Sequence, residues 1–138
     1  MLYFCRMKQL TAITIIAFLF SCKSGPAYKK AEDAQDAGRE FIRASLDGDY
    51  KKARFYMLND PDNILLIDKQ EANYRQLTNE EKNRYREASI RPLAIQKETD
   101  SITNYTYYQT SNPKDTTTIR VVLQNGEWLV DLKSVIKE

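Results

Sequence analysis

The sequence predicts an α+β fold in which helices come first and an antiparallel sheet follows. Between Ala31 and Ser45 the apolar or small residues lie three or four positions apart, which is the spacing of one helix face. From Ile90 onward apolar and polar residues alternate, as they do in strands with one buried face. Asn125-Gly126 is the strongest two-residue signal for a β-hairpin. Because the helical and strand patterns occupy separate parts of the chain, they favour neighbouring antiparallel strands over βαβ units.

Four helices are expected before the sheet. Gly48 ends the first helix, because glycine readily adopts the left-handed conformation of a C-cap. Asp49 can cap the second helix, and the Asn-Asp-Pro-Asp segment 59–62 is a turn signal. The segment 78–81, Thr-Asn-Glu-Glu, matches a capping box and starts the fourth helix. The first helix is expected to begin between residues 27 and 30 and to end at 47, and the others to span 49–58, 62–77 and 78–89.

Four strands are expected after residue 89. The first three are predicted over 90–98, 102–110 and 116–124, with a turn at 112–115 (Asn-Pro-Lys-Asp), and the fourth follows the hairpin signal through residues 128–132. Alternation places one set of apolar side chains on the face that meets the first helix. The predicted core therefore contains Phe41, Ile42, Ile119, Val121, Trp128 and Val130.

The N-terminal segment has the layout of a bacterial signal peptide. Two basic residues, Arg6 and Lys8, precede an apolar run over residues 10–20. This run is much shorter than the roughly 20 residues that a membrane-spanning helix needs. It ends at Leu19-Phe20-Ser21-Cys22, which resembles the lipobox of bacterial lipoproteins, where the cysteine is acylated and becomes the new N-terminus. The resemblance implies lipidation of Cys22, a lipid bilayer as partner, and a place in the bacterial cell envelope.

The domain organisation follows from this segment. Residues 1–21 are expected to be the lipoprotein signal peptide, residues 22–30 a tether broken by Gly25-Pro26, and residues 31–138 one domain. Translation from Met1 or from Met7 gives the same mature chain. Lys23 follows the cysteine, where known sorting rules associate Asp with inner-membrane retention, so the resemblance implies the outer membrane.

Composition argues against several classes of function. The chain holds 21 basic and 19 acidic residues, and the basic excess, Arg6 and Lys8, lies in the predicted signal peptide. A nucleic-acid partner is therefore not expected, since such proteins normally carry a basic excess on one element. There is no histidine, Cys5 lies in the signal peptide and Cys22 is the predicted lipidation site. No disulfide, metal site, cofactor or catalytic residue is expected, and Ser-His and Cys-His catalysis are excluded.

Two segments resemble the NTF2-like, cystatin-like superfamily. Residues 37–53, AGREFIRASLDGDYKKA, resemble its opening helix and turn, and residues 125–132, NGEWLVDL, resemble its last hairpin. The combination resembles the DUF4878 group of secreted bacterial lipoproteins. The resemblance implies a cone, in which the N-terminal helices pack in the concave face of a curved four-stranded antiparallel sheet and the mouth can hold a small ligand. Some relatives are isomerases or dehydratases that use a carboxylate with tyrosine or histidine inside the cone.

Four aromatic residues form the candidate pocket: Tyr50, Tyr105, Tyr107 and Trp128. Tyrosine supplies both apolar wall and hydroxyl donors to a ligand site. The other interpretation is that the tyrosines are β-formers that cover the sheet and that Trp128 anchors the core. Asp131 is expected to be exposed or paired with a lysine or arginine, since a catalytic base would need burial to raise its pKa.

The sequence thus favours a membrane-anchored lipoprotein that binds a small ligand or an envelope protein without catalysis. The alternative is a small isomerase or lyase with a carboxylate-tyrosine site in the cone.

Overall fold

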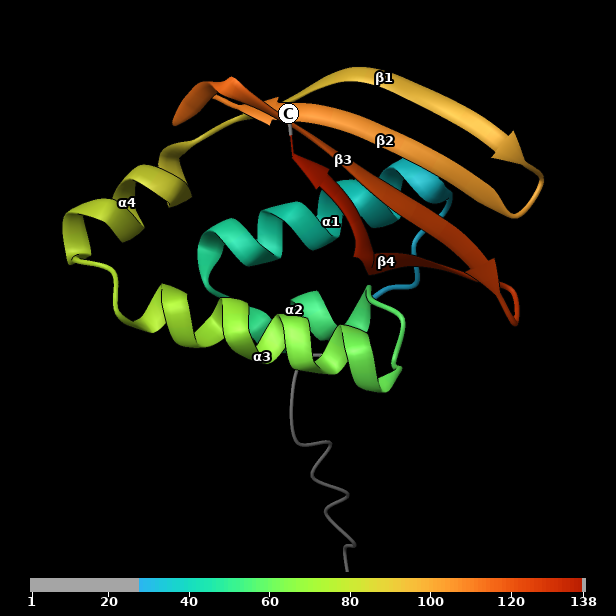
Figure 1. Cartoon of the computed structure of the whole chain (residues 1–138), viewed down its shortest axis with the longest axis horizontal. Coiled ribbons are helices and arrows are strands. Elements are labelled where there is room, and N and C mark those ends of the chain that lie inside the picture. The colour runs from blue at the N-terminus through green and yellow to red at the C-terminus, as the bar shows by residue number, and fades with distance from the viewer. Residues whose placement is uncertain (1–27, 138) are drawn as a thin grey trace, which may run out of the picture.

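The computed structural model describes residues 28–137, which form four helices followed by a four-stranded sheet (Figure 1). The helices are α1 (Ala34–Asp47), α2 (Tyr50–Phe55), α3 (Pro61–Arg75) and α4 (Asn79–Glu87), and the strands are β1 (Ile90–Thr99), β2 (Ile102–Gln109), β3 (Asn112–Gln124) and β4 (Glu127–Lys137). Each strand pairs antiparallel with the next one along the chain, so β1 and β4 are the edge strands of the sheet, and Val130 of β4 also bonds the backbone of Tyr56 and Leu58. The predicted α+β class with an antiparallel four-stranded sheet is confirmed.

The first helix begins later than predicted. Residues 28–33 are not helical, and α1 starts at Ala34 because the side chain of Asp33 accepts a hydrogen bond from the backbone N–H of Asp36 at 2.7 Å. An aspartate at this position satisfies one of the free N–H groups of a helix N-terminus. The predicted start between residues 27 and 30 is therefore wrong, whereas the predicted end is confirmed at Gly48, which has φ +75°.

The turn between β2 and β3 also differs from the prediction. The chain reverses at residues 110–111, and residues 112–115, the predicted turn, belong to β3. Gln109 pairs with Asn112 and Tyr108 with Thr116, so residues 113–115 form a bulge. A bulge accommodates Pro113, because proline has no N–H to donate to a neighbouring strand.

The core lies between α1 and one face of the sheet (Figure 1). Five of the six predicted core residues are buried, namely Phe41, Ile42, Ile119, Val121 and Val130, and Trp128 is half-buried against them. Gly38 lets α1 approach the sheet closely. A Cβ atom there would lie 3.4 Å from Ile119 Cδ1 and 3.5 Å from the ring of Tyr105.

Strand β4 carries an irregularity that brings α3 onto it. Arg120 pairs with Asp131 and Thr118 pairs with Ile136, so the four residues 132–135 stand opposite Ile119 alone. The bulge leaves backbone groups of β4 without strand partners, and such groups must be satisfied elsewhere when they are buried. A side chain in the first turn of α3 supplies a hydrogen-bond partner for one of these backbone groups.

The partner is Asn63, whose side chain is fully buried at the start of α3. Its Oδ1 atom accepts a hydrogen bond from the backbone N–H of Lys133 at 2.8 Å. Its Nδ2 atom donates to Asp60 at 3.0 Å and to Asp131 at 3.2 Å. The bonds to Lys133 and Asp131 link α3 to β4, and the bond to Asp60 links Asn63 to the N-cap of its own helix. Asn63 therefore fixes α3 against the last strand.

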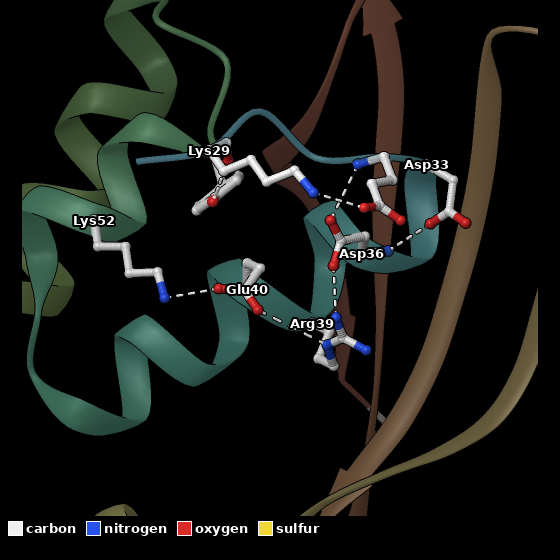
Figure 2. A network of polar contacts seen from close by, with 8 residues as sticks. Lys29, Asp33, Asp36, Arg39, Glu40 and Lys52 are labelled. Atoms are coloured by element: carbon white, nitrogen blue, oxygen red, sulfur yellow. Dashed lines mark hydrogen bonds and ion pairs between the residues drawn. The ribbon is translucent and has the colours of Figure 1, made fainter. Parts of the chain in front are cut away.

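Polar contacts fasten the segment that precedes α1. Figure 2 shows Lys29 and Asp36 at one end of a row of contacts that continues through Arg39 and Glu40 to Lys52 on α2. The hydroxyl of Tyr56 donates to the carbonyl of Lys29 at 2.6 Å. Solvent-accessible ion pairs of this kind contribute about 0–1 kcal/mol each. Residues 28–30, the end of the predicted tether, are thus held on the domain chiefly by the Tyr56 bond and neighbouring packing.

Candidate functional site

A cavity of about 660 Å³ lies between α1, α3, α4 and the sheet. Strand residues close one side and α1 closes another, while α3 and the turn after it form the third wall. The lining consists of Phe41, Ile42, Ser45, Leu46, Tyr50, Leu66, Lys69, Gln70, Asn73, Tyr74, Leu77, Tyr85, Tyr107, Gln109, Thr117, Ile119, Leu132, Lys133 and Val135. This volume falls in the range of about 300–1,000 Å³ that is usual for small-molecule sites.

Helix α3 shapes the mouth of the cavity. Leu66, Lys69 and Asn73 line the cavity and are also exposed, so the cavity opens to solvent along this side of α3. They are three and four positions apart, which places them on one helix face. Deeper on the same helix, Gln70 and Tyr74 are half-buried. A helix that packs on a core normally turns an apolar stripe inward, whereas this inward side adds polar groups to the fully buried Ile67.

Four tyrosines contribute aromatic wall and hydroxyl groups. Tyr50 from α2 and Tyr74 from α3 meet edge to face, with ring centroids 5.7 Å apart. Burial raises the pKa of Tyr50 and that of Tyr107 to about 12. Both hydroxyls therefore stay protonated at neutral pH and can donate hydrogen bonds. The fourth, Tyr85, comes from α4.

Arg43 of α1 holds α4 beside the cavity. Its guanidinium donates to the carbonyl oxygens of Ala88 at 2.6 Å and of Tyr85 and Arg86 at 3.1 Å. These carbonyls lie at the C-terminal end of α4, where the helix supplies few partners, and that of Tyr85 also accepts from the backbone N–H of Ala88 at 3.2 Å. The position of Tyr85 in the cavity wall thus depends on a residue of α1.

The charged groups of the lining are two lysines, and the described lining contains no Asp or Glu. The Nζ atom of Lys133 lies 3.1 Å from a carboxylate oxygen of Asp60 and 3.2 Å from one of Asp131, so its charge is neutralised. Lys69 has no ion pair within residues 28–137. Lys82 of α4 lies over the Tyr74 ring, 5.5 Å from its centroid, as in a cation–π contact.

Two polar atoms of the lining have no hydrogen-bond partner within the described residues. They are the hydroxyl oxygen of Tyr74 and the side-chain oxygen of Gln109, and both are buried from solvent. An unsatisfied buried polar group costs about 1–3 kcal/mol. A bound molecule with matching polar groups would remove that cost.

The structure separates the four predicted pocket residues. Tyr50 and Tyr107 line the cavity. Tyr105 is 1% exposed and packs under α1 beside Gly38, outside the lining. Trp128 is half-buried against the core and does not line the cavity either.

The residues that sequence reasoning missed come mainly from α3 and α4, where no motif was recognised. Among them are Lys69, Gln70, Tyr74 and Tyr85. One signal was available, since Asn63, Gln70 and Tyr74 recur at helical spacing and bring polar groups to positions where a core helix would have apolar residues.

Asp131 is buried, with 8% of its surface exposed, and it pairs with Lys133, so the second of the two expected alternatives, pairing with a basic residue, is the one confirmed. Burial by itself raises the pKa of this carboxyl, but hydrogen bonds from Ser134, Asn63 and Lys133 together outweigh burial and lower it below its ordinary value. Asp131 is therefore a charged structural group that faces α3, outside the cavity lining.

Other predicted features fall outside this description. Cys22, the signal peptide 1–21 and tether residues 22–27 lie outside the described residues. Among residues 28–137, no helix is long and apolar enough to cross a membrane. In the same part of the chain, no group of three or more Cys, Asp or Glu side chains is arranged to hold a metal ion.

Comparisons with known proteins identify no relative. No protein-family model, no curated protein and no solved structure matches the chain.

Proposed function

We propose that this protein is a lipid-anchored lipoprotein of the bacterial cell envelope, placed at the outer membrane, whose NTF2-like domain binds a small ligand without catalysis. The observation that carries the binding function is the cavity of about 660 Å³, with tyrosine and aliphatic walls and a mouth along α3. An apolar cavity with a few convergent polar groups is the usual form of a small-molecule site. This cavity is also the reason to favour a small ligand over an envelope protein as partner.

The lipid anchor rests on the order Leu19-Phe20-Ser21-Cys22 after the apolar run. A single acyl chain holds a protein to a membrane only marginally, and the several chains of a bacterial lipoprotein bind more firmly. The Cys22→Ala variant is expected to lose labelling by a palmitate analogue and to accumulate unprocessed. Labelling of this variant at the wild-type level would contradict the anchor.

The NTF2-like cone is supported by the order of elements, helices before an antiparallel meander, and by the position of α1 against one face of the sheet. The isomerase or lyase alternative needs an acid-base carboxylate among the tyrosines. The described lining supplies the tyrosines but no carboxylate, and the pKa of the nearby Asp131 is lowered rather than raised toward neutrality. These two observations favour binding.

The test of ligand binding uses a variant that fills the cavity. Ser45 lines the cavity, and its hydroxyl bonds only the Phe41 carbonyl of its own helix, so Ser45→Leu adds bulk at the cavity wall without breaking a bond between elements. Ser101→Leu, at the exposed β1–β2 turn, is the matched control. The wild type, Ser45→Leu and the control are each purified from cells and extracted for mass spectrometry of small molecules.

We expect a small molecule to be enriched with the wild type and with Ser101→Leu, and to be depleted with Ser45→Leu. If folded wild type and Ser45→Leu carry the same small molecules, the cavity is not the binding site and the proposed function is wrong.

A further inference from the structure

We infer that the ligand is a small organic anion, a carboxylic acid with an aromatic or alicyclic body, whose carboxylate pairs with Lys69 at the cavity mouth. This inference rests on the proposed function, because it specifies the chemical class of the molecule that occupies the same cavity.

The charges around α3 are divided between its two sides. The acids nearest to Lys69 along the helix, Asp68 and Glu71, both bind Arg54 of α2 at 2.7 Å. Glu71 also pairs with Arg75 at 3.0 Å. These carboxylates are thus directed to α2, and Lys69 stands on the cavity side. The cavity mouth carries a positive charge that no described carboxylate balances.

Two other lysines, Lys133 and Lys82, lie near the cavity. Lys133 is neutralised by Asp60 and Asp131, so it does not compete for an anion. Lys82 contacts the face of Tyr74 and has no ion pair within the described residues. With Lys69 at the mouth unpaired among the described residues and no acid in the described lining, the field at the mouth favours a negative ligand over a positive one.

The walls specify the body of the ligand. Tyr50 and Tyr74 already meet edge to face, and Tyr85 and Tyr107 complete an aromatic surface that a ring can join in the same way. The cavity volume equals that of roughly 20 water molecules at about 30 Å³ each, which sets the upper size of the ligand. The side-chain oxygen of Gln109, which has no partner within the described residues, can accept a hydrogen bond from a second group of the ligand.

The experiment measures binding of three probes that share one body and differ in charge: phenylbutyrate, phenylbutanol and phenylbutylammonium. Full-length lipoprotein is reconstituted in lipid nanodiscs, and calorimetric titrations are corrected with empty nanodiscs. The variant Lys69→Gln removes the charge at the mouth. The control Lys51→Gln removes an exposed lysine of α2 that does not line the cavity and has no ion pair within residues 28–137. Ser45→Leu reports whether binding takes place in the cavity.

We expect phenylbutyrate to bind about tenfold more tightly than phenylbutanol, since a hydrogen-bonded charge pair at a half-open site contributes about that factor. Added salt should weaken binding of the anion and leave that of the alcohol unchanged. Lys69→Gln should remove the preference for the anion without weakening the alcohol, whereas Lys51→Gln should keep the preference.

The outcomes separate this inference from the function it rests on. Equal affinity for the three probes, with loss of all binding in Ser45→Leu, would overturn the anion and leave the binding cavity in place. A preference for the anion that survives Lys69→Gln would overturn the role of Lys69. Absence of binding by all three probes would overturn the inferred ligand class, while the proposed function is decided by the extraction experiment with Ser45→Leu.

Discussion

Replacing Asn63 by aspartate is expected to make the stability of the domain depend strongly on pH. Asn63 is fully buried, and its amide group lies between two carboxylates. The Nδ2 atom donates to Asp60 at 3.0 Å and to Asp131 at 3.2 Å. In the Asn63→Asp variant an oxygen takes the place of this donor, so at neutral pH three carboxylates meet where an amide bridged two.

The magnitude follows from these distances. Two unit charges about 4 Å apart interact by about 4 kcal/mol at an effective dielectric constant of about 20. Asp60 lies at the surface and Lys133 contacts both native acids, so part of this repulsion is screened. Two lost hydrogen bonds add about 1 kcal/mol each. We expect a total loss of about 5 kcal/mol at neutral pH, which is comparable to the whole stability of many domains.

Acid should reverse most of this loss. The neighbouring carboxylates raise the pKa of the introduced group in the folded state above its value in the unfolded chain. The protonated group can donate again, so its favourable contribution is present below the unfolded pKa of about 4 and is lost as pH rises through the folded pKa. The difference from wild type should therefore shrink toward about pH 4.

The assay is urea unfolding, monitored by circular dichroism, at several pH values between about pH 4 and about pH 8. Asn63→Ala, which removes the hydrogen bonds without adding charge, should lose about 3 kcal/mol at every pH in this range. Asn83→Asp, on the exposed side of α4, should stay within about 0.5 kcal/mol of wild type. Equal losses for Asn63→Asp and Asn63→Ala at every pH would refute the assignment of Asn63 as a donor to both acids.

Three further predictions concern the surroundings of the cavity. Gly48 has φ +75°, and a Cβ atom there would overlap the ring of Tyr74. Gly48→Ala should therefore cost about 1–2 kcal/mol in chemical unfolding, and the aromatic NMR signals of Tyr74 should shift; an unchanged stability would contradict the geometry. Arg43→Ala should remove the three hydrogen bonds to the end of α4, at about 1 kcal/mol each, and hydrogen exchange should accelerate in α4, with Arg43→Lys giving little rescue because one ammonium cannot reproduce the planar fork. The pKa of Tyr50 and that of Tyr107 are raised to about 12 in the folded state, so their contribution is present below about pH 10 and is lost as pH rises from about 10 to about 12. Each tyrosine should lower the folding equilibrium constant about tenfold per pH unit in that interval, and Tyr107→Phe should reduce this alkaline loss; a variant with the wild-type alkaline profile would argue against the burial of that hydroxyl.

Local signals in the sequence predicted most of the elements. The capping box at Thr78 is present as expected, with both of its hydrogen bonds, and Asn125-Gly126 forms the hairpin between β3 and β4. These features are decided by residues within a few positions of one another, because a side chain caps or turns its own neighbouring backbone. The alternation of apolar residues in β3 and β4 likewise identified Ile119, Val121 and Val130 as core.

The start of α1 and the turn after β2 show where local patterns were insufficient. Periodicity extended the helix back past Asp33, although the cap placed its start at Ala34. The Asn-Pro-Lys-Asp segment has turn composition, yet its residues continue β3 through a bulge. In both cases the same residues are compatible with more than one local structure.

The sequence by itself determined the class of fold, the order of the elements and much of the core, because these follow from periodicity and from contacts between close neighbours. Only the tertiary structure decided the cavity and the role of Asn63. Asn63 meets Asp131 and Lys133 across separations of 68 and 70 residues, and the cavity walls come from all four helices and three strands. Which polar side chains face one another across such distances depends on the bulge in β4 and on the docking of α3. The bulge has no signature in its own residues, and the polar positions of α3 do not tell which strand the helix meets, because both features result from packing between elements that are remote in the chain.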